Sequence, residues 1–110
     1  MERFVKGDII VTSFPFTDLS STIKRPSLVL ANLKGDDIIL CEITTKERDD
    51  PDKITLSQND LESGKLKIHS FIRPSRIFTL RKSLILYKLG NLRKNKIKEV
   101  EKKLCEIFTR

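Results

Sequence analysis

The sequence predicts a mainly β (α+β) fold, a small barrel of antiparallel strands followed by one C-terminal helix. Short runs rich in Ile, Val and Leu, bounded by Gly, Pro and polar turns, recur over most of the chain. The first run is apolar on both faces, which suits a central strand in a strongly curved sheet. Helical spacing of apolar residues occurs only in the last segment. The 110 residues fit a single domain over 1–110.

Period-two alternation and turn residues place the individual strands. The lysine, glycine and aspartates of 34–37 predict a turn, so the strands on either side should form an antiparallel hairpin. The polar segment 18–23 is expected to be a loop that leads to Arg25, and the charged segment 46–53 is expected to be a solvated connection. One helical turn is expected over 57–64, with Ser57 as its N-cap and Gly64 as its end. The expected strands cover 9–14, 27–33, 38–45, 54–56, 67–72 and 76–80.

The final segment is predicted to be an amphipathic helix that docks on the sheet. The apolar segment 83–88 precedes it, and Gly90 is expected to end that segment. Lysines crowd the first turns of the helix, where the dipole favours acids, so this end is expected to fray or to face an anion. The helix should run from about residue 92 or 93 to 108, with an apolar stripe of Ile97, Val100, Leu104, Ile107 and Phe108.

The positive charge is concentrated at the C-terminal end of the chain. The net charge is +7, which points to a polyanion or an acidic protein as partner. Residues 1–80 hold 12 basic and 12 acidic side chains, whereas residues 81–110 hold 10 basic and 3 acidic ones. A solvated helix face and a nucleic-acid surface both explain such an excess, and the sequence leaves both open.

Cys41 and Cys105 stand alone in the sequence and form no metal-binding pattern, so no metal or other cofactor is expected. Cys41 lies inside an apolar strand and Cys105 beside the apolar stripe of the helix, where both should behave as small buried hydrophobes. No apolar run is long enough for a membrane span, and the N-terminus lacks the apolar segment of a signal peptide. We therefore expect a cytoplasmic protein.

Two stretches are candidates for a functional site. In the first, Arg25 precedes Pro26 at the start of a strand, and a guanidinium held at such a corner suits a phosphate. The second is the end of the next strand, where alternation places Glu42 and Thr44 on the face opposite Ile43. If Ile43 packs in the core, Glu42 and Thr44 face a ligand.

These stretches belong to a resemblance that extends over nearly the whole chain. The chain resembles the MazF/PemK (Kid-like) family of toxins from type II toxin-antitoxin pairs, whose relatives include the gyrase-directed CcdB-like toxins. The resemblance implies an SH3-like barrel with a C-terminal helix. The residues that carry it are Gly7–Val11, Phe14–Ser20, Lys24–Leu30, Cys41–Thr45, Ser70–Arg73 and Leu89–Leu92.

The resemblance implies a metal-independent endoribonuclease that cleaves single-stranded RNA (mRNA) through attack of the ribose 2'-hydroxyl on its own phosphate. Arg25 matches the catalytic arginine of the family and Thr44 its catalytic threonine. As RNA-binding candidates we add Lys24 beside the corner and Glu42 beside Thr44, together with Phe16 for base stacking and Arg73 as a second phosphate contact. A homodimer inhibited by a cognate acidic antitoxin is also implied.

Alternatives remain for each part of this interpretation. Arg25 could instead form a structural salt bridge with Asp18 or Glu42, and Arg73 an ordinary surface salt bridge. His69, the single histidine, is expected to be a hydrogen-bonded or surface residue rather than a general base. The whole chain could be a non-catalytic inhibitor of DNA gyrase on the same scaffold, or a barrel that binds nucleic acid through its basic end.

Overall fold

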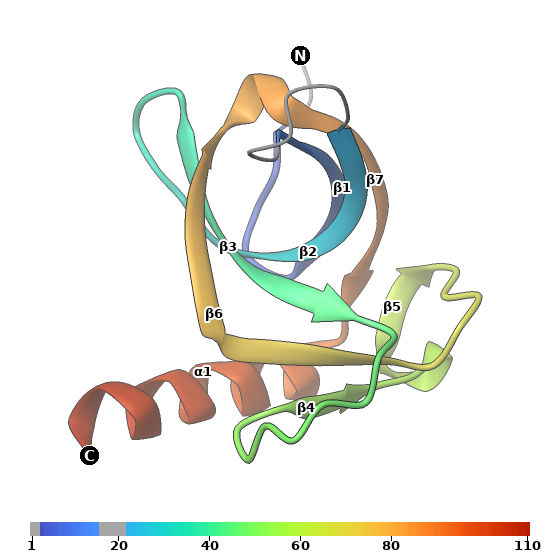
Figure 1. Ribbon diagram of the computed structural model, residues 1–110, viewed down its shortest axis with the longest axis vertical. Helices are drawn as coiled ribbons and strands as arrows, with labels where there is room; N and C mark the ends of the chain where they lie inside the picture. Colours follow the sequence, from blue (N-terminus) through green and yellow to red (C-terminus); the bar gives the residue numbers. More distant parts are fainter. Residues whose placement is uncertain (1–2, 16–21) are drawn as a thin grey trace.

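The computed structural model describes residues 3–15 and 22–110, which form one curved sheet and one long helix (Figure 1). The predicted loop over 18–23 lies outside these residues except for its last two positions, which belong to a strand. The strands are β1 (Asp8–Pro15), β2 (Thr22–Asn32), β3 (Asp37–Thr44), β4 (Ile54–Leu56), β5 (Leu61–Gly64), β6 (Ser70–Arg81) and β7 (Ile85–Leu92). The helices are η1 (Gln58–Asp60), η2 (Lys82–Leu84) and α1 (Lys94–Thr109).

The strands form a half-barrel in the order β4-β6-β3-β2-β1-β7-β5, and every pair is antiparallel. Figure 1 looks down the ring made by β1, β2, β3, β6 and β7. The predicted fold class is confirmed, as is the hairpin of β2 and β3. β1 pairs with β2 on one edge and β7 on the other, as its two apolar faces predicted.

β6 joins two strands that the sequence separated. It runs unbroken through Arg73 and Pro74, but its pairing with β3 is irregular there. Cys41 lies opposite Ile77 while the next residue, Glu42, lies opposite Arg73, so residues 74–76 are left out of the ladder. Proline has no N–H to donate to a neighbouring strand, and such irregularities accommodate it.

The prediction that Gly90 ends a segment is wrong, because Gly90 lies within β7. It sits opposite Gly64 of β5, a strand that the sequence did not predict. A Cβ on Gly90 would lie 2.2 Å from the carbonyl oxygen of Ser63, so glycine permits the close approach of β5 and β7. The helical turn predicted over 57–64 is only the three-residue η1, where the Asp60 carboxylate accepts the Ser57 N–H at 2.8 Å.

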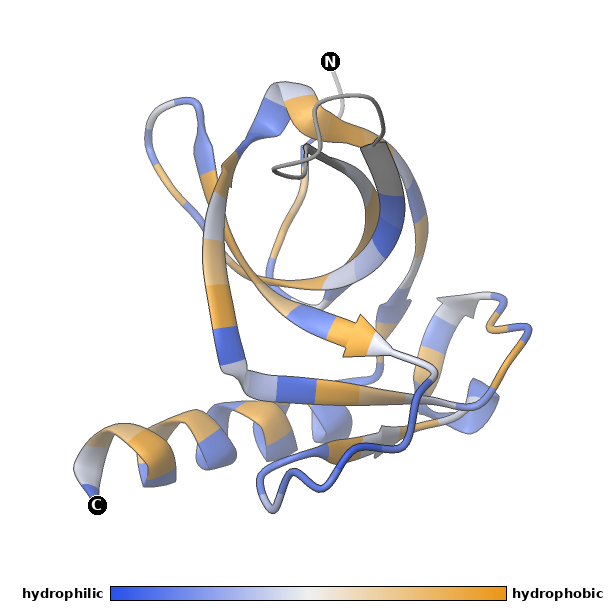
Figure 2. Ribbon diagram, in the orientation of Figure 1, coloured by the Kyte–Doolittle hydropathy of each residue, from blue (hydrophilic) through white to orange (hydrophobic). Residues whose placement is uncertain are grey.

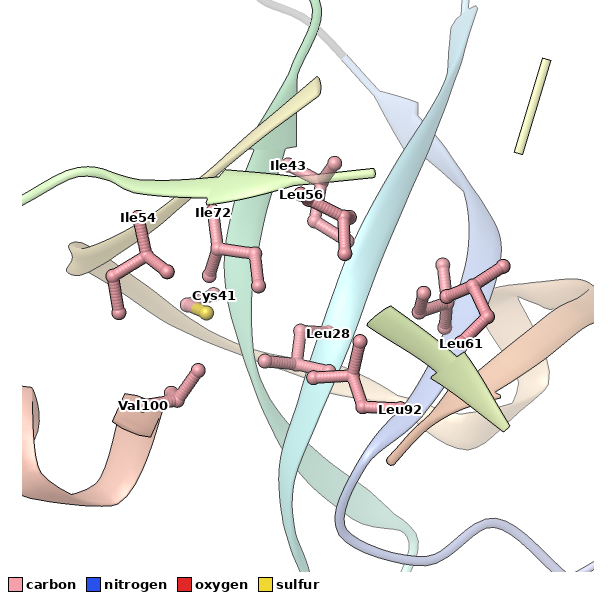
Figure 3. Close-up of a cluster of buried hydrophobic side chains, with 10 residues drawn as sticks. Leu28, Cys41, Ile43, Ile54, Leu56, Leu61, Ile72, Leu92 and Val100 are labelled. Carbon is pink, nitrogen blue, oxygen red and sulfur yellow. The ribbon is translucent and has the colours of Figure 1, made fainter. Parts of the chain in front are cut away.

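Two apolar clusters lie on opposite faces of the central strands. The helix-side core, between the sheet and α1, is made of Ile9, Leu28, Cys41, Ile43, Ile54, Leu56, Leu61, Ile72, Leu92 and Val100 (Figure 3). The ring core is made of Phe4, Ile10, Val29, Ile38 and Leu40. Strand alternation predicted this division along β3. Burial raises the pKa of the Cys41 thiol to about 12, and Glu42 adds to the effect, so Cys41 is a neutral core residue.

Helix α1 lies within two residues of its predicted bounds. Val100 is buried against the helix-side core, and Ile97, Leu104 and Ile107 are half-buried. Phe108 does not belong to the docked stripe, since 70% of it is exposed. Cys105 is also exposed, contrary to its prediction. Both lie on the last turn and a half, beyond the edge of the sheet that the helix covers (Figure 1).

Near the start of α1, Lys96 faces carboxylates, which is the second of the two outcomes predicted for this end of the helix. Lys96 is buried, with its Nζ 3.1 Å from Glu99 and 3.7 Å from Asp60. At the other end, Arg110 donates two hydrogen bonds to the buried Asp52, at 2.7 and 3.2 Å. These contacts raise the pKa of Arg110. Within the described ranges, no helix has the length and apolarity needed to cross a membrane.

Candidate functional site

A cleft of about 690 Å³ opens on the ring-core face of β2, β3 and β6, within the size range of ligand sites in proteins. Three of the predicted site residues, Arg25, Glu42 and Arg73, line it together. The cleft lies beside the ring core on the same face of these strands. Along β2 and β3 this face changes from the apolar Val29 and Leu40 to the polar Ser27 and Glu42. Its full lining is Arg25, Pro26, Ser27, Glu42, Arg48, Arg73, Ser75, Arg76, Ile77 and Phe78.

β2 positions Arg25 from within a strand, not from a loop as the sequence predicted. Arg25 lies opposite Thr12 of β1, while Ser27, on the same face of β2, lies opposite Glu42 of β3. Pro26 is accommodated because the ladder between β2 and β3 begins only at Ser27, which leaves the edge of β2 at Pro26 without a strand on that side. The two strands diverge from this point, and the cleft opens where they separate.

Arg73 is held between two carboxylates at one wall of the cleft. Its Nε lies 2.9 Å from Asp50 and its Nη1 3.2 Å from Glu42. All three side chains are largely buried, with 17%, 8% and 14% of Arg73, Asp50 and Glu42 exposed. The hydrogen bond to Asp50 raises the pKa of Arg73, against the effect of burial. Arg73 therefore forms a salt bridge, as its alternative role had it, but a largely buried one rather than the surface salt bridge that the sequence left open.

Asp50 comes from the segment 46–53, which was expected to be only a solvated connection and appears hydrophilic along most of its length in Figure 2. Burial by itself raises the pKa of the Asp50 carboxyl, but hydrogen bonds from the Arg73 side chain and the Asp52 N–H hold it below its usual range. The segment therefore packs the carboxylates of Asp50 and Asp52 inward, and Asp50 contributes to the wall of the site.

Arg48 and Arg76 also line the cleft, and neither is among the site residues predicted from the sequence. Arg76 lies in the three residues of β6 that leave the ladder, so the irregularity turns this part of the strand toward the cleft. Its Nε is 3.7 Å from Glu42, and 62% of its side chain is exposed. Arg76 could have been predicted from the second Arg-Pro pair, Arg73-Pro74, because a proline at this position indicates an irregularity in the strand.

Thr44 and Lys24, the other predicted residues that the structure describes, are not among the residues that line the cleft. Thr44 is half-buried at the end of β3, two residues beyond Glu42, and its Oγ1 accepts the N–H of Lys46 at 3.1 Å. Lys24 is exposed beside Arg25, and Phe16 lies outside the described residues. His69 is exposed, with its ring edge-on to Phe71 at 5.4 Å between centroids, which matches the surface role expected for it.

Arginines outnumber carboxylates among the described residues of the cleft. Four guanidinium groups line it together with the Glu42 carboxylate, and Asp50 adds a second carboxylate beside Arg73. This excess of guanidinium groups, together with hydroxyls and an aromatic ring, suits a polyanion whose phosphates need donors and whose bases need an apolar surface.

Comparison with known proteins agrees with this geometry. The model of the PemK-like, MazF-like toxin of type II toxin-antitoxin systems matches residues 5–108. The chain belongs to this family. The match includes β1 through nearly all of α1, so it covers the whole half-barrel and every residue of the cleft. No curated protein matches the chain.

Solved structures of family members share the fold at low sequence identity. MazF (Form-I) from Deinococcus radiodurans superposes with a TM-score of 0.76 at 19% identity, over 100% of both chains. A MazE-MazF structure (Form-III) from the same organism gives 0.75 at 20% identity, over 96% of this chain and 95% of that one. An endoribonuclease in complex with its cognate antitoxin, from a mycobacterial species, gives 0.72 at 18% identity, over 98% and 95%.

Proposed function

We propose that this toxin is an endoribonuclease that cleaves single-stranded RNA without a metal ion and is neutralised by a cognate acidic antitoxin. The observation that carries the proposal is the cleft in which Arg25 lies with three further arginines. Membership of the PemK-like, MazF-like family supports it. A similar solved structure is that of an endoribonuclease bound to its cognate antitoxin. An RNA substrate also suits the cytoplasmic location expected from the sequence.

In the proposed reaction the RNA supplies its own nucleophile. The 2'-oxygen forms a bond to the adjacent phosphorus as its proton leaves, the bond from phosphorus to the 5'-oxygen breaks, and that oxygen takes up a proton. Arg25 stabilises the charge that develops on the phosphoryl oxygens, because a guanidinium keeps its proton and donates in a planar fork. This electrostatic role needs no metal-bound nucleophile.

Thr44 is proposed to donate a hydrogen bond to the reacting group. Its Oγ1 accepts the Lys46 N–H, and its own proton is in no hydrogen bond within the described part of the chain. The Lys46 contact therefore orients the oxygen while the O–H remains available for a phosphate oxygen or the attacking hydroxyl. Glu42 is a poorer candidate for a proton acceptor, because two arginines already contact its carboxylate.

The test is cleavage of a pool of single-stranded RNA by purified protein in excess EDTA. Wild type should cleave, and Arg25→Ala should reduce kcat by about 10²- to 10³-fold, as loss of one preorganised donor does elsewhere. Arg81→Ala is the matched control, since Arg81 is an exposed arginine on β6 outside the cleft lining. The proposal fails if wild type leaves the RNA intact in EDTA, or if Arg25→Ala cleaves as fast as the control.

The oligomeric state and the inhibitor are proposed with the activity. Exposed apolar side chains on the surface of the half-barrel, such as Leu33, Leu86 and Tyr87, suit contact with a second copy. Light scattering should then give twice the 12.7 kDa of the chain. A net charge of +7 favours an acidic partner. A synthetic acidic peptide from the cognate antitoxin should inhibit cleavage, whereas a scrambled peptide of equal charge should not.

A further inference from the structure

The four arginines of the cleft differ in how far the protein itself already engages their donors. Arg73 uses its Nε and Nη1 in bonds to Asp50 and Glu42, and only 17% of its side chain is exposed. The two carboxylates therefore already compensate the positive charge of the Arg73 guanidinium. A phosphate could take over Arg73 only by displacing a buried partner, which would leave a carboxylate buried without its cation.

Arg76 is engaged much more weakly. Its contact with Glu42 joins Nε to Oε2 at 3.7 Å, which is beyond hydrogen-bond distance. Its two terminal amino groups have no partner in the part of the chain that the structure describes, and 62% of the side chain is exposed. A contact this long, made by an arginine that is mostly exposed, contributes little to stability, and Glu42 keeps its contact with Arg73. A phosphate can therefore replace Glu42 as the partner of Arg76 at small cost.

Arg48 is not compensated at all in the described residues. It lies on the segment between β3 and β4, it is exposed, and its guanidinium forms no ion pair or hydrogen bond there. The backbone around it is fixed, because the Arg48 carbonyl accepts the Lys53 ammonium at 2.7 Å and the Asp50 N–H at 2.8 Å. A fixed backbone with an uncompensated guanidinium at the cleft suits the binding of an anion.

We propose that Arg48 and Arg76 bind the RNA phosphates next to the one that Arg25 holds, and that Arg73 is a positioning residue that fixes the wall of the cleft. The inference rests on the proposed function, which provides the polyanion. It assigns phosphate binding to Arg48 and Arg76 instead of Arg73, which was predicted from the sequence as a second phosphate contact. It also gives Glu42 a defined effect: its carboxylate competes with RNA for Arg76, so Glu42 should weaken RNA binding.

The experiment measures the affinity of the full chain for a single-stranded RNA in which every 2'-hydroxyl is methylated. This RNA lacks the nucleophile, so binding is measured without cleavage. Each phosphate contact contributes about 0.7 to the slope of log affinity against log salt concentration. Arg48→Ala and Arg76→Ala should each reduce the slope by that amount and weaken binding by about fivefold.

Three further variants separate the roles. Arg73→Gln should keep the wild-type slope while lowering the melting temperature, as a positioning residue does. Arg76→Lys should restore most of the slope, because it restores the charge. Glu42→Gln should bind the RNA about threefold more tightly than wild type. Arg81→Ala should match wild type, because it removes an exposed arginine outside the cleft.

The inference is overturned if Arg73→Gln reduces the slope while Arg48→Ala and Arg76→Ala do not, or if Glu42→Gln weakens binding. These outcomes are separate from a failure of the proposed function. Wild type that cleaves RNA while both alanine variants keep its slope contradicts only this inference. Wild type that binds the methylated RNA with the expected slopes but never cleaves unmodified RNA contradicts only the nuclease.

Discussion

At the scale of single residues, Asp50 determines how Arg73 is held. It approaches from a segment outside the sheet and makes the shorter of the two ion pairs of Arg73, 2.9 Å from its Oδ2 to the Arg73 Nε. Only 8% of the carboxylate side chain is exposed, so water screens the contact weakly. We therefore expect Asp50 to contribute to stability, unlike a typical surface partner.

Asp50→Asn should lower the free energy of unfolding by about 2 kcal/mol at pH 7, the usual value of a hydrogen bond to a charged group. The Asp50 pKa is lower in the folded protein than in the unfolded chain. Its contribution is therefore complete above the unfolded pKa, about 3.9, and is lost as the pH falls through the folded pKa. The difference between wild type and Asp50→Asn should be constant above about pH 4 and should shrink below it.

Urea denaturation at pH 7 and at pH 3 measures both effects. Asp49→Asn is the matched control, since Asp49 is the exposed neighbour of Asp50 and forms no ion pair in the described ranges. A constant difference between wild type and Asp50→Asn across this pH range would mean that the Arg73 contact does not lower the pKa. A difference equally large in the Asp49→Asn control would point to net charge instead.

The sequence predicted the residues of the site unevenly, and the reason is visible in these contacts. Glu42 could be predicted because strand alternation determines its face, and Arg25 because it precedes a proline in a stretch that resembles the family. Whether an arginine is compensated depends on partners from distant segments, such as Asp50 for Arg73, and no local pattern records that. Arg76 enters the cleft only because β6 leaves its ladder at that point, and Arg48 only because its loop folds back.

At the scale of elements, β5 and β7 depend on two facing glycines. Gly64 has φ of +96°, in the region that favours glycine, and its partner Gly90 lies where a Cβ would meet the Ser63 carbonyl. From the sequence, Gly90 was predicted to end a segment, because glycine usually weakens a strand. The four strands β1 to β4 were predicted within a few residues of their ends, except the start of β2, since branched apolar residues alternate there without glycine.

Gly90→Ala should lower the free energy of unfolding by about 1–3 kcal/mol, because the new methyl group would push β5 away from β7. Gly35→Ala is the control, since Gly35 lies in the hairpin turn and a Cβ added there would meet no atom within 4 Å. Thermal unfolding of the two variants provides the comparison. Equal melting temperatures for Gly90→Ala and wild type would show that β5 does not need this close approach.

At the scale of the whole molecule, the lysines of α1 and the cleft lie on different sides of the sheet. Val100 of α1 packs with Leu28 and Cys41, whereas the cleft is lined from the Ser27 and Glu42 face of the same strands. No residue of α1 lines the cleft. Whether the lysines of the basic C-terminal end form a solvated helix face or assist RNA binding therefore depends on their distance from the cleft. The molecule measures 35 × 32 × 32 Å, against a Debye length of about 8 Å at physiological salt.

Neutralising the exposed lysines of α1 should leave RNA binding nearly unchanged at physiological salt. The variant Lys94→Gln, Lys98→Gln, Lys102→Gln removes three of the seven net positive charges from positions spaced one turn apart on the helix. The helix adds a diameter of about 10 Å to the sheet that separates these lysines from the cleft, so salt screens their field. Affinity for the methylated RNA should stay within about twofold at 0.15 M salt.

At 0.01 M salt the Debye length grows to about 30 Å, close to the size of the molecule, and the same lysines should then attract RNA from across the sheet. The triple variant should bind several-fold more weakly than wild type under this condition alone. A variant with arginine at the three positions keeps the charge and should match wild type in both salts. A tenfold loss at 0.15 M would instead mean that RNA lies directly on α1, as the interpretation of a basic nucleic-acid-binding end requires.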